Sequence, residues 1–154
     1  MRNKISALIA EGQGLVDAYQ GPTAALLREL LVRWWDHMTQ TQAGGICKVI
    51  IAEVRNFPDL AQFYTDEVVL PAHRLLAGAL QRGIDRGEFR PVPVADAVHV
   101  LITPPLFLAL HRHSIGACPV QGVALDERSV IETQVDLMLQ GLQVRAPAGK
   151  GARP

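Results

Sequence analysis

Apolar residues recur along this chain at the three-to-four-residue spacing of helices, and no segment alternates as a strand does. The pattern predicts helices over residues 3–19, 24–39, 46–57, 60–84, 94–111 and 126–142. Glycine and proline lie between these segments and separate them. We therefore expect an all-α fold, a single helical domain of about six helices, with residues 146–154 as a disordered tail.

Local signals place several helix ends and one irregularity. Thr23 and Asp126 are residue types that cap helix N-termini, and Gly44-Gly45 is expected to break the chain. Pro71 lies inside a continuous apolar pattern, where its missing N–H removes a helical hydrogen bond. A kink is therefore expected near residues 67–68.

Composition and charge restrict the class of protein. The 154 residues are 49% hydrophobic and 19% charged, which is enough for one buried core and excludes general disorder. Fifteen basic and fifteen acidic residues give a net charge of zero. Because proteins that bind phosphate backbones are usually basic, this chain alone is not expected to bind DNA.

The compartment follows from the cysteines and the N-terminus. Cys47 and Cys118 are too few for a disulfide framework, and the first residues do not form a secretory signal. The most apolar stretch, residues 92–110, is interrupted by Asp96, His99 and two prolines. It is therefore interpreted as a buried helix, and the protein as cytoplasmic with no membrane segment.

Candidate catalytic and metal-binding residues form no convincing constellation. His111 and His113 are two residues apart, which on a helix places them on different faces. Cys47 has no evident base beside it, and none of the serines lies in a nucleophile-elbow motif. We expect no catalytic residues, no metal and no cofactor.

The segment from residue 46 to 115 carries an ordered set of motifs. Glu53-Val54-Arg55 is followed by Phe57-Pro58-Asp59-Leu60, Phe63-Tyr64, Pro71 and the closing RGIDRGEFR of residues 82–90. In this order and spacing the segment resembles the ligand-binding, dimerising half of tetracycline-repressor-like (TetR family) transcription regulators. The resemblance implies a homodimer that binds a small, largely apolar or aromatic ligand and controls a DNA-binding unit.

The N-terminal residues extend the resemblance. Arg2-Asn3-Lys4 is similar to the turn with which the DNA-binding half of such regulators ends. Residues 1–145 are therefore expected to be the ligand-binding and dimerisation domain. The N-terminal helix-turn-helix domain is expected to be absent from this chain, so that contact with DNA depends on a missing domain.

A ligand cavity is predicted among residues 24–39, 60–84 and 94–111. Pro104 and Pro105 leave the carbonyls of Val100 and Leu101 without intrahelical donors. Either a bound ligand satisfies these carbonyls, or the prolines simply introduce a kink that lets the helix pack. Bulky walls and a few polar tips are typical of small-molecule pockets. Only one of the adjacent residues Trp34 and Trp35 should face the cavity. The predicted lining is Trp34, His37, Met38, Phe63, Tyr64, Leu101, Pro104, Phe107 and His111.

The last two helices are predicted to form a two-fold four-helix bundle with a second copy. Their apolar stripes exceed what one short domain needs, so an exposed apolar patch is expected in the single chain. Two alternatives remain, a small helical enzyme using His111 or Cys47 and a purely structural dimerisation module. The predicted interface is Leu101, Leu108, Ile131, Val135, Met138 and Leu142.

Overall fold

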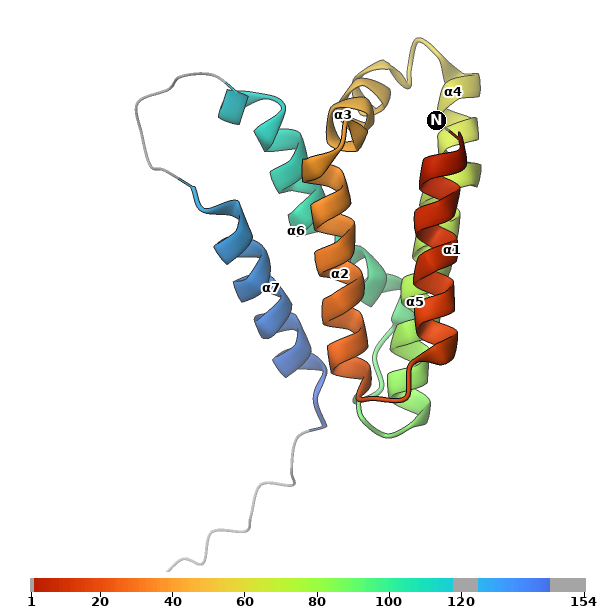
Figure 1. Ribbon diagram of the computed structural model, residues 1–154, viewed down its shortest axis with the longest axis vertical. Coiled ribbons are helices and arrows are strands. Elements are labelled where there is room, and N and C mark those ends of the chain that lie inside the picture. The colour runs from red at the N-terminus through yellow and green to blue at the C-terminus, as the bar shows by residue number, and fades with distance from the viewer. Residues whose placement is uncertain (1, 118–124, 145–154) are drawn as a thin grey trace, which may run out of the picture.

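The computed structural model describes residues 2–117 and 125–144, and over these residues the chain is helical with no strand (Figure 1). The elements in chain order are α1 (Arg2–Ala18), α2 (Thr23–Gln40), α3 (Ala43–Glu53), α4 (Pro58–Tyr64), a π-helical turn η1 (Thr65–Val69), α5 (Leu70–Asp85), α6 (Val94–Arg112), a 3-10 turn η2 (Ile115–Ala117) and α7 (Glu127–Leu142). Since α4, η1 and α5 are continuous, they correspond to the one long helix predicted there.

Helix α2 is the central element of the domain. It contacts α1, α3, α5, α6 and α7, and Figure 1 shows it between α7 on one side and α1 with α5 on the other. Because neighbouring helices surround α2 on several sides, apolar residues are required around most of its circumference. The largest fully buried side chains include Leu26, Leu27, Leu80, Leu101, Ile131 and Val135.

Several local predictions are confirmed. The π-helical turn η1 at Thr65–Val69 lies one turn before Pro71, where a disturbance of the helical hydrogen bonds is expected. Asp126 caps α7, and its carboxylate accepts a hydrogen bond of 3.1 Å from the Ser129 amide. The tail of residues 146–154 and Cys118 lie outside the described residues.

Two local predictions are wrong. Gly44-Gly45 does not break the chain but lies in the first turn of α3. A Cβ at Gly44 would lie 2.8 Å from the Met38 carbonyl oxygen and 2.7 Å from His113 Nε2, so glycine serves close packing there. Thr23 is not the cap of α2, because Pro22 is the N-cap residue and Thr23 is the first residue of the helix.

The RGIDRGEFR motif ties the end of α5 to the turn between α1 and α2. The Arg82 guanidinium donates to the Thr23 hydroxyl and to the carbonyls of Tyr19 and Gly21. Glu88 accepts a 2.9 Å hydrogen bond from the Thr23 amide, one of the free N–H groups at the start of α2. The motif that carries the family resemblance is therefore structural in this chain.

Two glycines of the same motif bring Phe89 into the core. Gly87 has a φ of 71°, a backbone conformation that favours glycine at the end of a helix. The chain then turns back, and the Phe89 ring, 3% exposed, packs directly onto Gly83, where a Cβ would collide with it. The Arg90 amide donates to the Leu142 carbonyl at 2.8 Å, which connects this turn to the end of α7.

The Glu88 carboxylate is expected to make folding sensitive to acid. Hydrogen bonding from Thr23 holds its pKa below the ordinary value. A lowered folded-state pKa contributes stability above the unfolded pKa of about 4.3, and that stability is lost as pH falls through the folded pKa. The melting temperature of the wild type should therefore fall more steeply than that of Glu88→Gln below about pH 4.5. If the melting temperatures of the two proteins fall in parallel between pH 6 and 3, this prediction is wrong.

The prolines of α6 do not interrupt the helix, which is assigned continuously across Pro104 and Pro105. Of the two carbonyls freed by the prolines, that of Leu101 accepts a 3.4 Å hydrogen bond from Gln134 Nε2 of α7. A protein group from the next helix therefore supplies the donor. By length and composition alone α6 could cross a membrane, which for one such helix is weak evidence, and in this fold it includes six buried residues and packs against α3, α5 and α7.

Candidate ligand pocket

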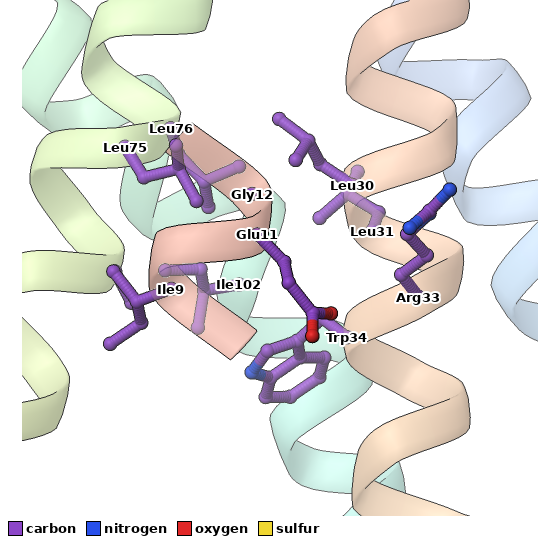
Figure 2. A pocket seen from close by; sticks show the side chains of 11 residues that line it. Ile9, Glu11, Gly12, Leu30, Leu31, Arg33, Trp34, Leu75, Leu76 and Ile102 are labelled. Atoms are coloured by element: carbon purple, nitrogen blue, oxygen red, sulfur yellow. The ribbon is translucent and has the colours of Figure 1, made fainter. Parts of the chain in front are cut away.

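A pocket with a volume of about 70 Å³ lies where α1, α2, α5 and α6 meet. Figure 2 shows the side chains of these helices converging on the space, with Trp34 on one side of it. The lining residues are mostly apolar: Ile9, Glu11, Gly12, Leu30, Leu31, Arg33, Trp34, Ala72, Leu75, Leu76 and Ile102. Such a space suits an apolar molecule.

The walls follow from helical spacing. Leu30, Leu31 and Trp34, spaced i, i+1, i+4, form one face of α2, and Ala72, Leu75 and Leu76, spaced i, i+3, i+4, form one face of α5. Helix α1 closes the space at Gly12, where a Cβ would lie 2.6 Å from Leu75 Cδ2. Glycine therefore allows α1 to approach α5 closely at the edge of the pocket.

Two charged residues, Glu11 and Arg33, line the pocket, and only one of them forms an ion pair. Arg33 pairs with Glu29 one turn earlier on α2, with its Nη2 2.7 Å from Oε1. Across the described part of the chain, neither a hydrogen bond nor an ion pair engages the carboxylate of Glu11. The positive charge at the pocket is thus neutralised by a neighbour and the negative charge is not.

A second hollow, about 560 Å³ in volume, lies open between α2 and α7. Its lining includes Arg28 and Asp136, which form an ion pair, together with Glu29, Gln140 and Gln143. Because this hollow is more polar and more open than the pocket beside Trp34, the smaller pocket fits a largely apolar ligand better.

All three segments predicted to surround the cavity contribute to the pocket between α1, α2, α5 and α6. Trp34 lines it, whereas Trp35 is 3% exposed in the core. The contribution of α1 was not predicted. Ile9 and Gly12 lie one turn apart on α1 and so share one face of the helix. This spacing indicates a face that packs, but it does not indicate which helices the face contacts.

Most of the individually predicted residues lie elsewhere. Met38 and Leu101, 6% and 0% exposed, pack inside the core, and Phe63 and Phe107, 44% and 65% exposed, lie at the surface. These four residues do not line this pocket, because neighbouring helices cover the first two and the other two face outward. His37, Pro104 and His111 are half-buried and likewise do not line it.

Tyr64 contacts Cys47 instead of the pocket. The two side chains hydrogen-bond, and burial raises the pKa of the Cys47 thiol, so that the reactive thiolate is disfavoured at neutral pH. Burial and Cys47 also raise the pKa of Tyr64. This pair therefore offers no support for a nucleophilic role of Cys47.

Within residues 2–117 and 125–144 no group of three or more potential ligands is placed to hold a metal ion. His73 of α5 and His99 of α6 stack edge to face, with ring centres 4.9 Å apart. Burial and the neighbouring His99 lower the pKa of His73, which favours its neutral form, and the contact between the two rings contributes to the packing of α5 on α6.

The family model described as the Tetracyclin repressor-like C-terminal domain matches residues 18–121. The chain belongs to this family. The match spans α2 to α6 and so includes three of the four helices that surround the pocket, while α7 and nearly all of α1 lie outside it. Neither the curated proteins nor the solved structures include a significant match to the chain.

Membership of the Tetracyclin repressor-like family establishes the general class of the chain. The domain belongs to transcription regulators, in which it serves ligand binding and dimerisation. The all-α fold is consistent with this.

The predicted interface residues of this Tetracyclin repressor-like domain are mostly covered by the chain itself. Leu101, Leu108, Ile131, Val135 and Leu142 are between 0% and 8% exposed, and Met138 is half-buried. The expectation that these residues form an exposed apolar patch in the single chain is wrong, because α2 packs against both α6 and α7. Apolar residues that do face outward on these helices are Val100, Phe107, Val130 and Leu137.

Proposed function

We propose that this chain is the effector-sensing and dimerisation domain of a cytoplasmic transcription regulator. The observation that carries the proposal is the apolar pocket beside Trp34, within a fold of the Tetracyclin repressor-like family. A small molecule with an apolar body would bind there, and no catalytic step is required of the protein.

Ligand binding would be coupled to the position of α1. Pockets for drug-sized ligands are roughly 300–1,000 Å³, so the space of about 70 Å³ has to widen for any but a very small ligand. Helix α1 contacts α5 closely at Gly12 beside the pocket, and Arg82 holds the chain at the C-terminal end of α1 by donating to the Tyr19 carbonyl, so α1 can pivot about that end. A ligand would therefore favour an arrangement in which α1 moves away from α5. Through α1 this change would reach a DNA-binding unit.

Dimerisation would use the outward faces of α6 and α7. Val100 and Phe107 are seven residues apart on α6 and are 49% and 65% exposed, and Val130 and Leu137 repeat this spacing on α7 with 36% and 65%. Each pair is two turns apart and so forms an apolar stripe along its helix. Two such helices from each copy can close a four-helix bundle with two-fold symmetry.

The pocket is tested by blocking it. A panel of small apolar and aromatic compounds should contain members that raise the melting temperature and change the fluorescence of Trp34 in the wild type. Ala72→Phe fills the pocket and should weaken the apparent affinity for these compounds at least tenfold, which corresponds to about 1.4 kcal/mol of binding free energy.

Gly78→Phe is the matched control, because a Cβ at Gly78 on the same helix meets no atom within 4 Å. It should leave ligand binding unchanged. If no compound alters either the melting temperature or the fluorescence of the wild type, the sensor proposal fails and a structural dimerisation module is the better account.

A further inference from the structure

We infer that the effector of this pocket is a compact organic cation with an apolar or aromatic body. The inference rests on the proposed function and specifies the class of molecule that the pocket selects. It depends on three features of the pocket, namely a free carboxylate, an aromatic face next to it and an otherwise apolar lining.

The free carboxylate is that of Glu11, which lines the pocket and is also exposed to solvent. It has no partner within the described ranges of the chain, whereas Arg33, the cation of the lining, donates through both Nε and Nη2 to Glu29 Oε1 at 3.1 and 2.7 Å. The two lining charges therefore do not cancel each other. The pocket carries a net negative charge that a cationic ligand would balance and an anionic ligand would meet unfavourably.

The aromatic face is that of Trp34. Its side chain is half-buried, and in Figure 2 the Glu11 side chain extends toward the indole. An indole ring attracts cations through its negative face, and tryptophan does so best among the aromatic residues. A carboxylate and an indole on the same side of one pocket are a combination that favours a soft cation, such as a quaternary ammonium group, over a neutral group of equal shape.

The remaining lining fixes the other end of the ligand. Leu30, Leu75, Leu76 and Ile102 offer no hydrogen-bonding side chain, so the part of the ligand between α2, α5 and α6 has to be apolar. The histidines and the tyrosine that the sequence suggested as polar tips do not line the pocket. The cationic group of the ligand would therefore be recognised by the Glu11 carboxylate and the Trp34 ring, where α1 faces the pocket.

A matched pair of probes tests the inference. Benzyltrimethylammonium and neopentylbenzene have the same shape and differ in charge, and binding of each to the full chain is measured by calorimetry. We expect the cation to bind roughly tenfold more tightly or better, with a preference that weakens as salt is added. Glu11→Gln should remove most of this preference, and Trp34→Leu should reduce it while the protein stays folded.

Asp17→Asn is the control for Glu11→Gln, because it removes the same charge from the same helix outside the pocket lining. It should leave the preference unchanged. Equal binding of the two probes to the wild type, or an undiminished preference in Glu11→Gln, overturns the cation inference while the sensor function stands. If neither probe nor any compound of the wider panel binds, both proposals fail.

Discussion

Phe89→Ala is expected to lower the free energy of unfolding by about 3–5 kcal/mol, the range for removing a fully packed phenylalanine. Phe89 is 3% exposed, and its ring packs onto Gly83 of α5. The residue also forms an isolated bridge with Gln143 at the end of α7. Loss of the ring therefore leaves a cavity between α5 and the connection to α6, which the surrounding helices can fill only in part.

Urea denaturation followed by circular dichroism measures this effect. Phe57→Ala is the control, since Phe57 is 58% exposed at the start of α4 and its removal should change stability by less than about 0.5 kcal/mol. If the two variants are equally stable, the interpretation of the RGIDRGEFR motif as a structural tie is wrong.

Leu137→Glu is expected to convert the dimer to a folded monomer. Leu137 is 65% exposed in the single chain, so a charge there costs the monomer little, but in the proposed bundle it would be buried opposite a second copy. Loss of a central interface residue often costs about 2 kcal/mol or more, which corresponds to a roughly thirtyfold weaker dimer. Sedimentation at micromolar concentration measures the association, and circular dichroism verifies the fold.

Val135→Glu separates the outward face of α7 from its core face. Val135 is 0% exposed, so this substitution places a carboxylate among apolar residues of the same chain. We expect the protein to unfold, or the pKa of the new carboxyl group to rise strongly so that it is buried in its neutral form. Val49→Glu, on α3 at a position 58% exposed, should leave both the fold and the dimer unchanged. A dimer of unchanged affinity in Leu137→Glu would place the interface elsewhere.

The helices themselves are predictable because their causes are local. The apolar spacing of α2, the cap of α7 at Asp126, the glycine at position 87 and the disturbance before Pro71 all depend on neighbours within a few residues. Gly44 shows where local reasoning fails. A glycine that normally breaks a helix is retained inside α3, because His113, far along the chain, leaves no space for a side chain.

The sequence by itself determined the fold class, the family and three of the four segments that surround the pocket, since helical periodicity and motif order are properties of the chain alone. Only the tertiary structure decided which face of each helix is covered. On α6, Leu101 and Phe107 are both apolar, yet one lies in the core and the other at the surface, because that depends on where α2 and α7 pack. The same holds for Glu11, an exposed residue of α1 that lines the pocket because α1 packs against α2 and α5.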